Sequence, residues 1–344
     1  MTPPIQIKTS EEFVSLSAGK VFIRWDTPQV TASRSTQENT TGPIILLLHG
    51  ATVPNWQFDY LVPLLLERLC KSRHDVLYRT LRIDLYGHGR SSRPDVVYDL
   101  NLFVNQVCQV LQSLNLVTGD NSQLAMIGIG HSMGSPILTE VATRHPRLFQ
   151  KIVLVAPMLD YMALQPHSRL LRVPLLGEAL MRFGIVPKLK ERRRKRYGAI
   201  GKSHLGDLFA EEVESKRMDE LSFEEVLLRM FRDGAVGDQT RAYAKLGEML
   251  HRKNVSVETN SDDELKVLVL WGTADTVADK RHICRILCLL ENTELDKGKE
   301  FPTIDEKSKI FYTALEGLEH NLLMSHSDLC SESICEFIER MSCI

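Results

Sequence analysis

A serine between two glycines is the first feature of this sequence that could do chemistry. Ser132 stands between Gly130 and Gly134 in the run IGIGHSMGSP, after an apolar segment and before a helix-like one. A serine on a sharp turn from a strand into a helix is exposed to attack a carbonyl carbon, and larger flanking side chains would collide there. A tight glycine turn without a reactive role gives the same pattern, but the strand before it and the helix after it favour a nucleophile.

Two later residues could activate this serine. A nucleophilic serine needs a base, and the base needs an acid that orients it. Asp275 follows the apolar run VLVL in WGTAD, and His320 follows IFYTAL in EGLEHN. Both are therefore expected in loops at the carboxyl ends of strands. The sequence predicts acyl transfer with Ser132 as nucleophile, Asp275 as acid and His320 as base. His326 remains the alternative base and Asp160 the alternative acid.

Acyl transfer also needs two main-chain N–H groups that stabilise the negative charge on the reacting oxygen. We expect them at Met133, directly after the serine, and at Ala51, which follows the apolar run ending in LLLHG. His49 in the same loop is interpreted as a support for the loop and not as a reacting group. Trp56 and Tyr86, with Met133 and residues of the insertion described below, are the expected walls of a substrate pocket.

The rest of the chain alternates strand-like and helix-like segments, which are the elements needed to position these residues. Strands are predicted at 21–26, 43–50, 76–85, 124–129, 152–155, 267–270 and 310–315. Helices are predicted at 58–70, 100–116, 133–144, 279–290 and 327–341. Residues 31–42 and 292–309 are polar and are predicted as loops. This alternation predicts an α/β fold with a doubly wound, mostly parallel sheet.

A long interruption separates two of the predicted strands. Residues 158–264 contain no convincing buried strand and are rich in Leu, Arg, Lys and Glu at helical spacing. Such a length is well above the usual connection in an α/β unit, so we expect an inserted helical cap. The predicted organisation is a core in two parts, residues 1–157 and 265–344, with the cap at 158–264 between them.

The cap contains an apolar segment, residues 170–187, followed by the basic run KLKERRRKRY at 188–197. The composition favours a solvated helix face for this run. The alternative is weak, peripheral contact with an anionic membrane, because several cations near such a surface add their attractions. In the same way, the apolar segment either forms a lid that touches lipid or only packs the cap onto the core.

Composition excludes several classes of protein. The 344 residues are 43% hydrophobic and 25% charged, with a formal net charge of −2, so a nucleic-acid partner is not expected. No secretory signal and no apolar run of about 20 residues is visible. The seven cysteines, Cys343 among them, form no CxxC pair, and we interpret them as free thiols in a reducing, intracellular and cytoplasmic setting. No metal or organic cofactor is expected, and the oligomeric state is left open.

Five motifs in order give the sequence a family resemblance: LLLHG, IDLYGHGRSS, GHSMG, WGTAD and GLEHN. Together they resemble the α/β-hydrolase superfamily, and within it the capped esterases and the monoacylglycerol-lipase-like hydrolases. The resemblance covers nearly all of the core and stops in the cap. It implies that Asp84 and His88 support a loop and are not catalytic. Ser135 departs from the second glycine that many lipase-like members have there, and we expect it to be tolerated.

The resemblance implies a serine hydrolase that cleaves a carboxylic ester of a lipid or a small molecule through an acyl-enzyme. Other reactions on the same site stay open, namely those of a thioesterase, an amidase, a carbon–carbon bond hydrolase or an acyltransferase. A catalytically silent binding protein is the remaining class, and the complete set of Ser132, Asp275 and His320 disfavours it.

Overall fold

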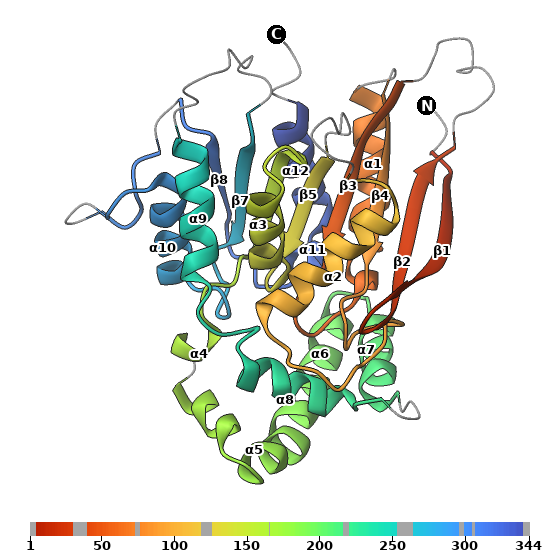
Figure 1. Cartoon of the computed structure of the whole chain (residues 1–344), viewed down its shortest axis with the longest axis vertical. Helices are drawn as coiled ribbons and strands as arrows, with labels where there is room; N and C mark the ends of the chain where they lie inside the picture. Colours follow the sequence, from red (N-terminus) through yellow and green to blue (C-terminus); the bar gives the residue numbers. More distant parts are fainter. Residues whose placement is uncertain are drawn as a thin grey trace.

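A single eight-stranded sheet organises the protein (Figure 1). The computed structural model describes residues 5–29, 40–72, 76–117, 126–164, 166–215, 220–252, 264–295, 299–304 and 307–339. The strands are β1 (Ile7–Leu16), β2 (Gly19–Pro28), β3 (Thr40–Leu48), β4 (Val76–Ile83), β5 (Met126–His131), β6 (Phe149–Val155), β7 (Lys266–Gly272) and β8 (Ile310–Leu315). They lie in the order β1-β2-β4-β3-β5-β6-β7-β8. The strands from β3 to β8 are parallel, while β1 and β2 are antiparallel at one edge, so the predicted fold class is confirmed.

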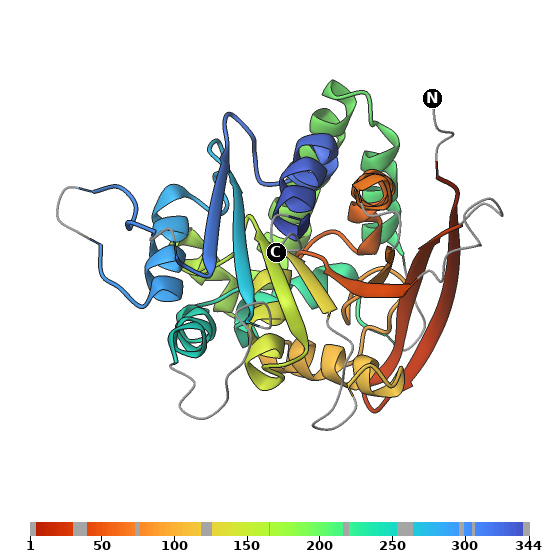
Figure 2. The same cartoon turned by 90° about the horizontal axis from the view of Figure 1, so that it is seen from above.

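The central strands are apolar on both faces because both faces are covered. In β3, Ile44, Leu46 and Leu48 point into one apolar cluster, and the intervening Ile45 and Leu47 point into another. Helices α2 (Leu100–Ser113), α3 (Gly134–Arg144), α9 (Thr240–His251) and α10 (Lys280–Glu291) contribute to the first cluster, and α1 (Leu61–Ser72) and α12 (Ser327–Glu339) to the second. Figure 2 shows these two layers on opposite sides of the sheet. A continuous apolar run is what a strand buried on both faces requires.

The predicted elements differ from the observed ones mainly at their ends. The helix expected from residue 58 begins at Leu61, because Asn55–Phe58 forms a separate short 3-10 helix, η2. Strand β3 ends at Leu48, so His49 and Gly50 belong to a loop. Residues 40–42, predicted as loop, are the start of β3, and Thr40 and Thr41 pair with β4, whereas 31–39 lie outside the described residues. The predicted ends at 124–125 and 340–341 also lie outside them.

Strand β1 was not predicted at all. Its sequence IKTSEEFVSL is mostly polar, and its side chains are mostly exposed. It nevertheless pairs with β2 along its whole length, from Ile7 opposite Pro28 to Leu16 opposite Gly19. An edge strand takes its stability from main-chain pairing with its neighbour, so its composition carries little of the apolar signal that identifies central strands.

In its described residues, the segment between β6 and β7 consists of helices joined by turns and holds no strand. It holds α4 (Tyr161–Leu164), the 3-10 helix η3 (Pro166–Arg172), α5 (Leu176–Ala179), the π-helix η4 (Leu180–Ile185), α6 (Val186–Ala199), α7 (His204–Glu214), α8 (Phe223–Asp233) and α9. Helices α4 to α8 lie below the sheet in Figure 1, whereas α9 packs beside α3 and α10 on the sheet face. Phe209 and Phe223 join the same apolar cluster as β3, so α7 and α8 pack on the sheet's own core.

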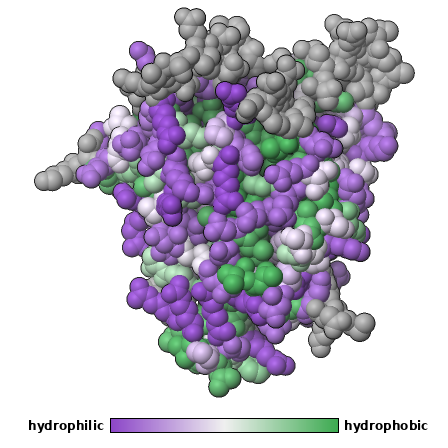
Figure 3. All heavy atoms as spheres, viewed as in Figure 1, coloured by the Kyte–Doolittle hydropathy of each residue, from purple (hydrophilic) through white to green (hydrophobic). Residues whose placement is uncertain are grey.

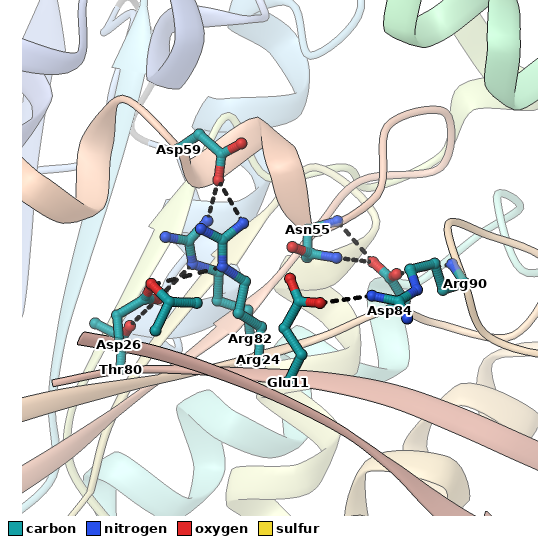
Figure 4. A network of polar contacts seen from close by, with 10 residues as sticks. Glu11, Arg24, Asp26, Asn55, Asp59, Thr80, Arg82, Asp84 and Arg90 are labelled. Atoms are coloured by element: carbon teal, nitrogen blue, oxygen red, sulfur yellow. Dashed lines mark hydrogen bonds and ion pairs between the residues drawn. The ribbon is translucent and has the colours of Figure 1, made fainter. Parts of the chain in front are cut away.

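A network of charged side chains ties the antiparallel edge of the sheet to the segment before α1 (Figure 4). Asp26 on β2 accepts hydrogen bonds from Thr80 and from Arg82 Nε on β4, both at 2.8 Å. Arg82 and Arg24 both reach Asp59, which follows η2. A buried ion pair adds little net stability, but it fixes the position of the groups that it joins. The segment that leads out of the His49–Gly50 loop is therefore held against the sheet.

Within the described residues, none of the helices has both the length and the apolar character that crossing a membrane would need.

Candidate active site

Ser132 lies on a tight turn between β5 and α3 and has the left-handed backbone angle φ of 52°. Its N–H donates to the carbonyl of Val155 at 2.9 Å, which ties the turn to the end of β6. The flanking glycines are needed for space. A Cβ atom on Gly130 would lie 2.5 Å from the carbonyl oxygen of Gly134, and one on Gly134 would lie 2.2 Å from that of Leu48. Both distances are shorter than any real contact, so the turn admits only glycine at these two positions.

Ser135 occupies the position at which the sequence departs from the lipase-like pattern. It is fully buried, and its hydroxyl donates to the carbonyl of Gly130 at 2.7 Å. The extra side chain is accommodated because it closes the turn with a hydrogen bond of its own.

The structure brings together the three side chains that the sequence singles out. His320 Nε2 lies 3.0 Å from Ser132 Oγ, and His320 Nδ1 lies 2.8 Å from Asp275 Oδ2. Because a carboxylate only accepts, Nδ1 carries the proton and donates to Asp275, which leaves Nε2 free to accept from the serine hydroxyl. The other oxygen of Asp275 accepts from the N–H groups of Val277 and Ala278, at 2.7 and 2.9 Å. These bonds fix the carboxylate in the loop after β7.

The alternative base and acid lie elsewhere. His326 follows α11 (Leu322–Ser325), and its Nδ1 lies 2.9 Å from the hydroxyl of Ser325. Asp160 accepts from the N–H of Ala163 at 3.0 Å, which caps the first turn of α4. The geometry therefore selects His320 and Asp275 as the partners of Ser132.

The loop after β3 lies directly against the serine. A Cβ atom on Gly50 would lie 3.2 Å from Ser132 Cβ, so Ala51, the next residue, adjoins the same space. Met133, the residue after the serine, is buried at the start of α3. Ala51 and Met133 therefore stay the predicted main-chain donors, one in the loop after β3 and one at the N-terminus of α3.

Two buried histidines hold that loop. His49 Nε2 accepts from the N–H of Leu85 at 2.9 Å, and its Nδ1 donates to the carbonyl of Gly50 at 2.8 Å. His88 Nε2 lies 2.8 Å from the carbonyl of Ala51. Burial lowers the pKa of both His49 and His88, so both are neutral supports at neutral pH.

Asp84 reinforces the same region. Its carboxylate accepts from the N–H and the side-chain amide of Asn55, at 2.8 and 2.6 Å, and from the N–H of Arg90 at 3.0 Å (Figure 4). Asp84 and His88 therefore join the loops after β3 and β4, in agreement with the structural role expected for both.

The two predicted pocket residues have different surroundings. Trp56 is half-buried and packs against a small apolar cluster made of Val53, Tyr197, Leu205 and Met324. The hydroxyl of Tyr86 donates to the carbonyl of Gly19, 3.3 Å away in the turn between β1 and β2. Tyr86 is buried, and this end of its ring is engaged at the β1–β2 turn. Its role as a pocket wall stays a prediction.

His131 is a site residue that the sequence analysis missed. Its Nε2 donates to the main-chain carbonyl of His320 at 3.0 Å, and its Nδ1 is buried without a partner. Burial above all, with smaller contributions from His320 and Arg193, lowers the pKa of His131 to about 3. No sequence signal marks it, because the glycine–serine–glycine pattern specifies the two glycines and the serine and leaves the residue between them open. It holds the base through the main chain of His320.

We expect the stability of the fold to fall in acid, partly through His131. The unfolded chain binds a proton near the ordinary histidine pKa of about 6.5, whereas folded His131 stays neutral down to about 3. Between these values the unfolded state holds more protons, so the free energy of unfolding drops by about 1.4 kcal/mol per pH unit from this group. Urea unfolding at pH 6.0, 5.0 and 4.5 will show a shallower slope for His131→Phe than for the wild type. Parallel slopes would contradict this role.

The basic run in α6 is not a uniform solvated face. Arg193 is buried, stacks on the ring of Phe209 with Cζ 4.4 Å from the ring centre, and donates to the hydroxyl of Thr52, next to Ala51. Arg196 forms an ion pair at 2.7 Å with Glu319, the residue before His320. Helix α6 therefore contacts both the loop of Ala51 and the loop of His320, which the composition of the run did not reveal.

In the described residues, no group of three or more His, Cys, Asp and Glu side chains is placed to hold a metal ion. Six cysteines of the described part of the chain are buried thiols, and burial raises the pKa of both Cys330 and Cys335 to about 12. Thiols with a raised pKa are poor nucleophiles. Cys343 lies outside the described residues.

This fold and this turn define the class of protein. A mostly parallel sheet that carries a serine on a turn between β5 and α3, with partners after β7 and β8, is the α/β-hydrolase fold. Residues 45–329 match the family model described as "Alpha/beta hydrolase family". The chain therefore belongs to this family, and we class it as a hydrolase.

The chain is also similar to individual proteins. An uncharacterised protein of Mycobacterium tuberculosis is 25% identical over 276 residues, 78% of this chain and 73% of the relative. Monoglyceride lipase of Rattus norvegicus is 31% identical over 121 residues, 35% of this chain and 36% of the lipase. The crystal structure of a bromoperoxidase from Bacillus anthracis covers 96% of this chain and 100% of its own, with a TM-score of 0.63 and 15% identity. That last likeness bears on the fold alone.

Proposed function

We propose that this hydrolase cleaves a carboxylic ester of a lipid or a small molecule through an acyl-enzyme on Ser132. The observation that carries the proposal is the unbroken chain of hydrogen bonds from Ser132 Oγ to His320 Nε2, at 3.0 Å, and from His320 Nδ1 to Asp275, at 2.8 Å. A serine with such a base and acid is an activated nucleophile for acyl transfer. The identity with monoglyceride lipase supports an ester as the substrate.

The proposed reaction has two steps. Ser132 Oγ attacks the ester carbonyl carbon while its proton passes to His320 Nε2, and Asp275 stabilises the imidazolium that forms. The N–H groups of Ala51 and Met133 stabilise the oxyanion. The tetrahedral intermediate then releases the alcohol, which takes the proton from His320. Water repeats the attack on the acyl-enzyme, which releases the acid and restores the serine. No step in this scheme uses a metal or an organic cofactor.

The test is the rate of hydrolysis on a panel of matched substrates. Esters, thioesters, amides and vinylogous diketones of the same chain length are compared by kcat/KM, with an added alcohol to detect acyl transfer. We expect the esters to give the highest value. A preference for thioesters or diketones would mean that this site cleaves a thioester or a carbon–carbon bond and not the proposed ester bond. No turnover of any substrate, together with no labelling by a fluorophosphonate, would make the chain a binding protein.

We also propose that α4 to α8 form a lid whose tip makes weak contact with membranes. Five apolar side chains at this tip are exposed, namely Leu170, Val173, Leu175, Leu176 and Phe183, with Leu175 at 84% and Phe183 at 76%. Figure 3 has a hydrophobic patch at the lower end of the molecule, where Figure 1 places α5. Exposed Arg192 and Arg194 follow on α6 and supply positive charge for an anionic surface.

The double variant Leu175→Glu and Phe183→Glu is therefore expected to lose binding to anionic vesicles. Wild-type binding should weaken as salt rises, since the attraction is screened over a Debye length of about 10 Å at 0.1 M salt. Co-sedimentation with vesicles at two salt concentrations measures both effects. Leu295→Glu is the matched control, because this exposed leucine lies far along the chain, after α10. If the wild type, the double variant and the control all sediment equally at both salt concentrations, the basic run in α6 is only a solvated helix face.

A further inference from the structure

Arg193 is a buried cation at the edge of the candidate active site. Its side chain reaches from α6 to Thr52, which directly follows Ala51, and Nη1 donates to the hydroxyl of Tyr197 at 3.0 Å. The guanidinium lies on the ring of Phe209. It is close enough to His131, the neighbour of Ser132, to affect the pKa of that imidazole. The positive charge therefore lies beside the loop of the expected oxyanion donor.

This guanidinium has no anionic partner among the described residues. Its polar contacts are two hydroxyl groups, those of Thr52 and Tyr197, and its Nε is buried without any hydrogen bond. Three of its five N–H groups are thus unused. Burial lowers the pKa of Arg193, yet a guanidinium stays protonated at neutral pH. Buried arginines are normally paired because an isolated charge in a protein interior is costly.

The neighbouring charged side chains do not compensate the positive charge of Arg193. Arg196, one turn further along α6, is already paired with Glu319. Lys202 Nζ lies 3.9 Å from the centre of the Tyr60 ring and donates to the carbonyl of Met324. Glu319 thus accompanies Arg196 and Asp328 lies near Lys202, whereas the described residues supply no acid for Arg193. An uncompensated buried cation attracts an anion.

We propose that Arg193 binds an anionic oxygen group of the substrate, a carboxylate or a phosphate, carried a short distance from the ester bond. This inference rests on the proposed ester hydrolysis and names the class of ester. The free N–H groups of a guanidinium lie in one plane and match the oxygens of either anion. The anion would supply the missing partner and compensate the buried charge when the substrate is bound.

The test compares three 4-nitrophenyl esters of equal chain length: the hexanoate, the hydrogen adipate and the 6-phosphonooxyhexanoate. We expect wild-type kcat/KM to be higher for at least one charged ester than for the neutral one, and the two charged esters separate carboxylate from phosphate. Arg193→Gln should lower the ratio of charged to neutral kcat/KM by about 10- to 100-fold, mainly through KM. Arg194→Gln removes a charge from the next, exposed position of α6 and should keep the wild-type ratio.

A wild-type preference for the neutral ester, or an unchanged ratio in Arg193→Gln, would overturn the inference. Calorimetry separates it from the proposed function. Two proteins are titrated with the charged and the neutral esters: Ser132→Ala, and Ser132→Ala combined with Arg193→Gln. Neither protein should hydrolyse the esters during the titration. Tighter binding of a charged ester that depends on Arg193 supports the inference even if the wild type cleaves no ester. Equal binding of all three esters contradicts it, even if all are cleaved.

Discussion

Replacement of Ser132 by alanine will abolish covalent labelling by a fluorophosphonate and lower kcat by about 10⁴- to 10⁶-fold. The reason is that Ser132 Oγ is the atom within 3.0 Å of His320 Nε2, so its removal leaves the base without a nucleophile to activate. Binding and the main-chain donors are retained, which accounts for the residual rate. The measurement combines probe labelling with steady-state kinetics on the best ester of the panel. Thermal unfolding checks that the fold is intact.

Ser135→Ala is the matched control for this experiment. It removes a hydroxyl three residues along the chain, one that is bonded to Gly130 and fully buried. We expect Ser135→Ala to lose about 1 kcal/mol of stability and to keep its labelling by the probe. Turnover by Ser132→Ala close to that of the wild type would refute the assignment of the nucleophile, as would loss of labelling in a folded Ser135→Ala protein.

Asp275→Asn should lower kcat by about 10⁴-fold, because an amide no longer holds His320 in the tautomer that leaves Nε2 free to accept. The main-chain bonds from Val277 and Ala278 can still reach the amide oxygen, so the loop should keep its conformation. Asp160→Asn is the matched control. This carboxylate caps α4, and asparagine caps helices equally well, so kcat should stay within about threefold of the wild type.

Steady-state kinetics on one ester decide between the two acids. A larger loss in Asp160→Asn than in Asp275→Asn would move the acid to the loop after β6. Equal, small losses would mean that His320 acts without an orienting carboxylate.

The residues that the structure gathers around Ser132 differ in how far the sequence identifies them. Ser132, Asp275 and His320 each follow an apolar strand, and parallel strands end at one edge of the sheet, so their meeting could be predicted. His131 and Arg193 could not be predicted in this way. His131 acts through the main chain of His320, and Arg193 lies within a run of cations of which most are exposed.

The strands of the sheet also differ in how well the sequence identifies them. Strands β3, β5, β6 and β7 are buried on both faces, and their continuous apolar runs locate them within a few residues. Strand β1 escaped because pairing with β2, and not burial, stabilises it. Tyr86 is a case that the pattern leaves open, because an aromatic residue after a strand is compatible with a pocket wall or with core packing.

The backbone of Ser132 has a consequence for how this protein can change over generations. A φ of 52° costs a residue with a side chain about 1 to 2 kcal/mol, and glycine adopts it freely. Glycine at position 132 should therefore make the folded protein more stable but leave it without a nucleophile. If selection acted on stability alone, substitutions at position 132 would come to favour glycine. Retention of serine at the most strained point of the turn then requires selection for reactivity, and a lineage released from that selection should lose this hydroxyl early.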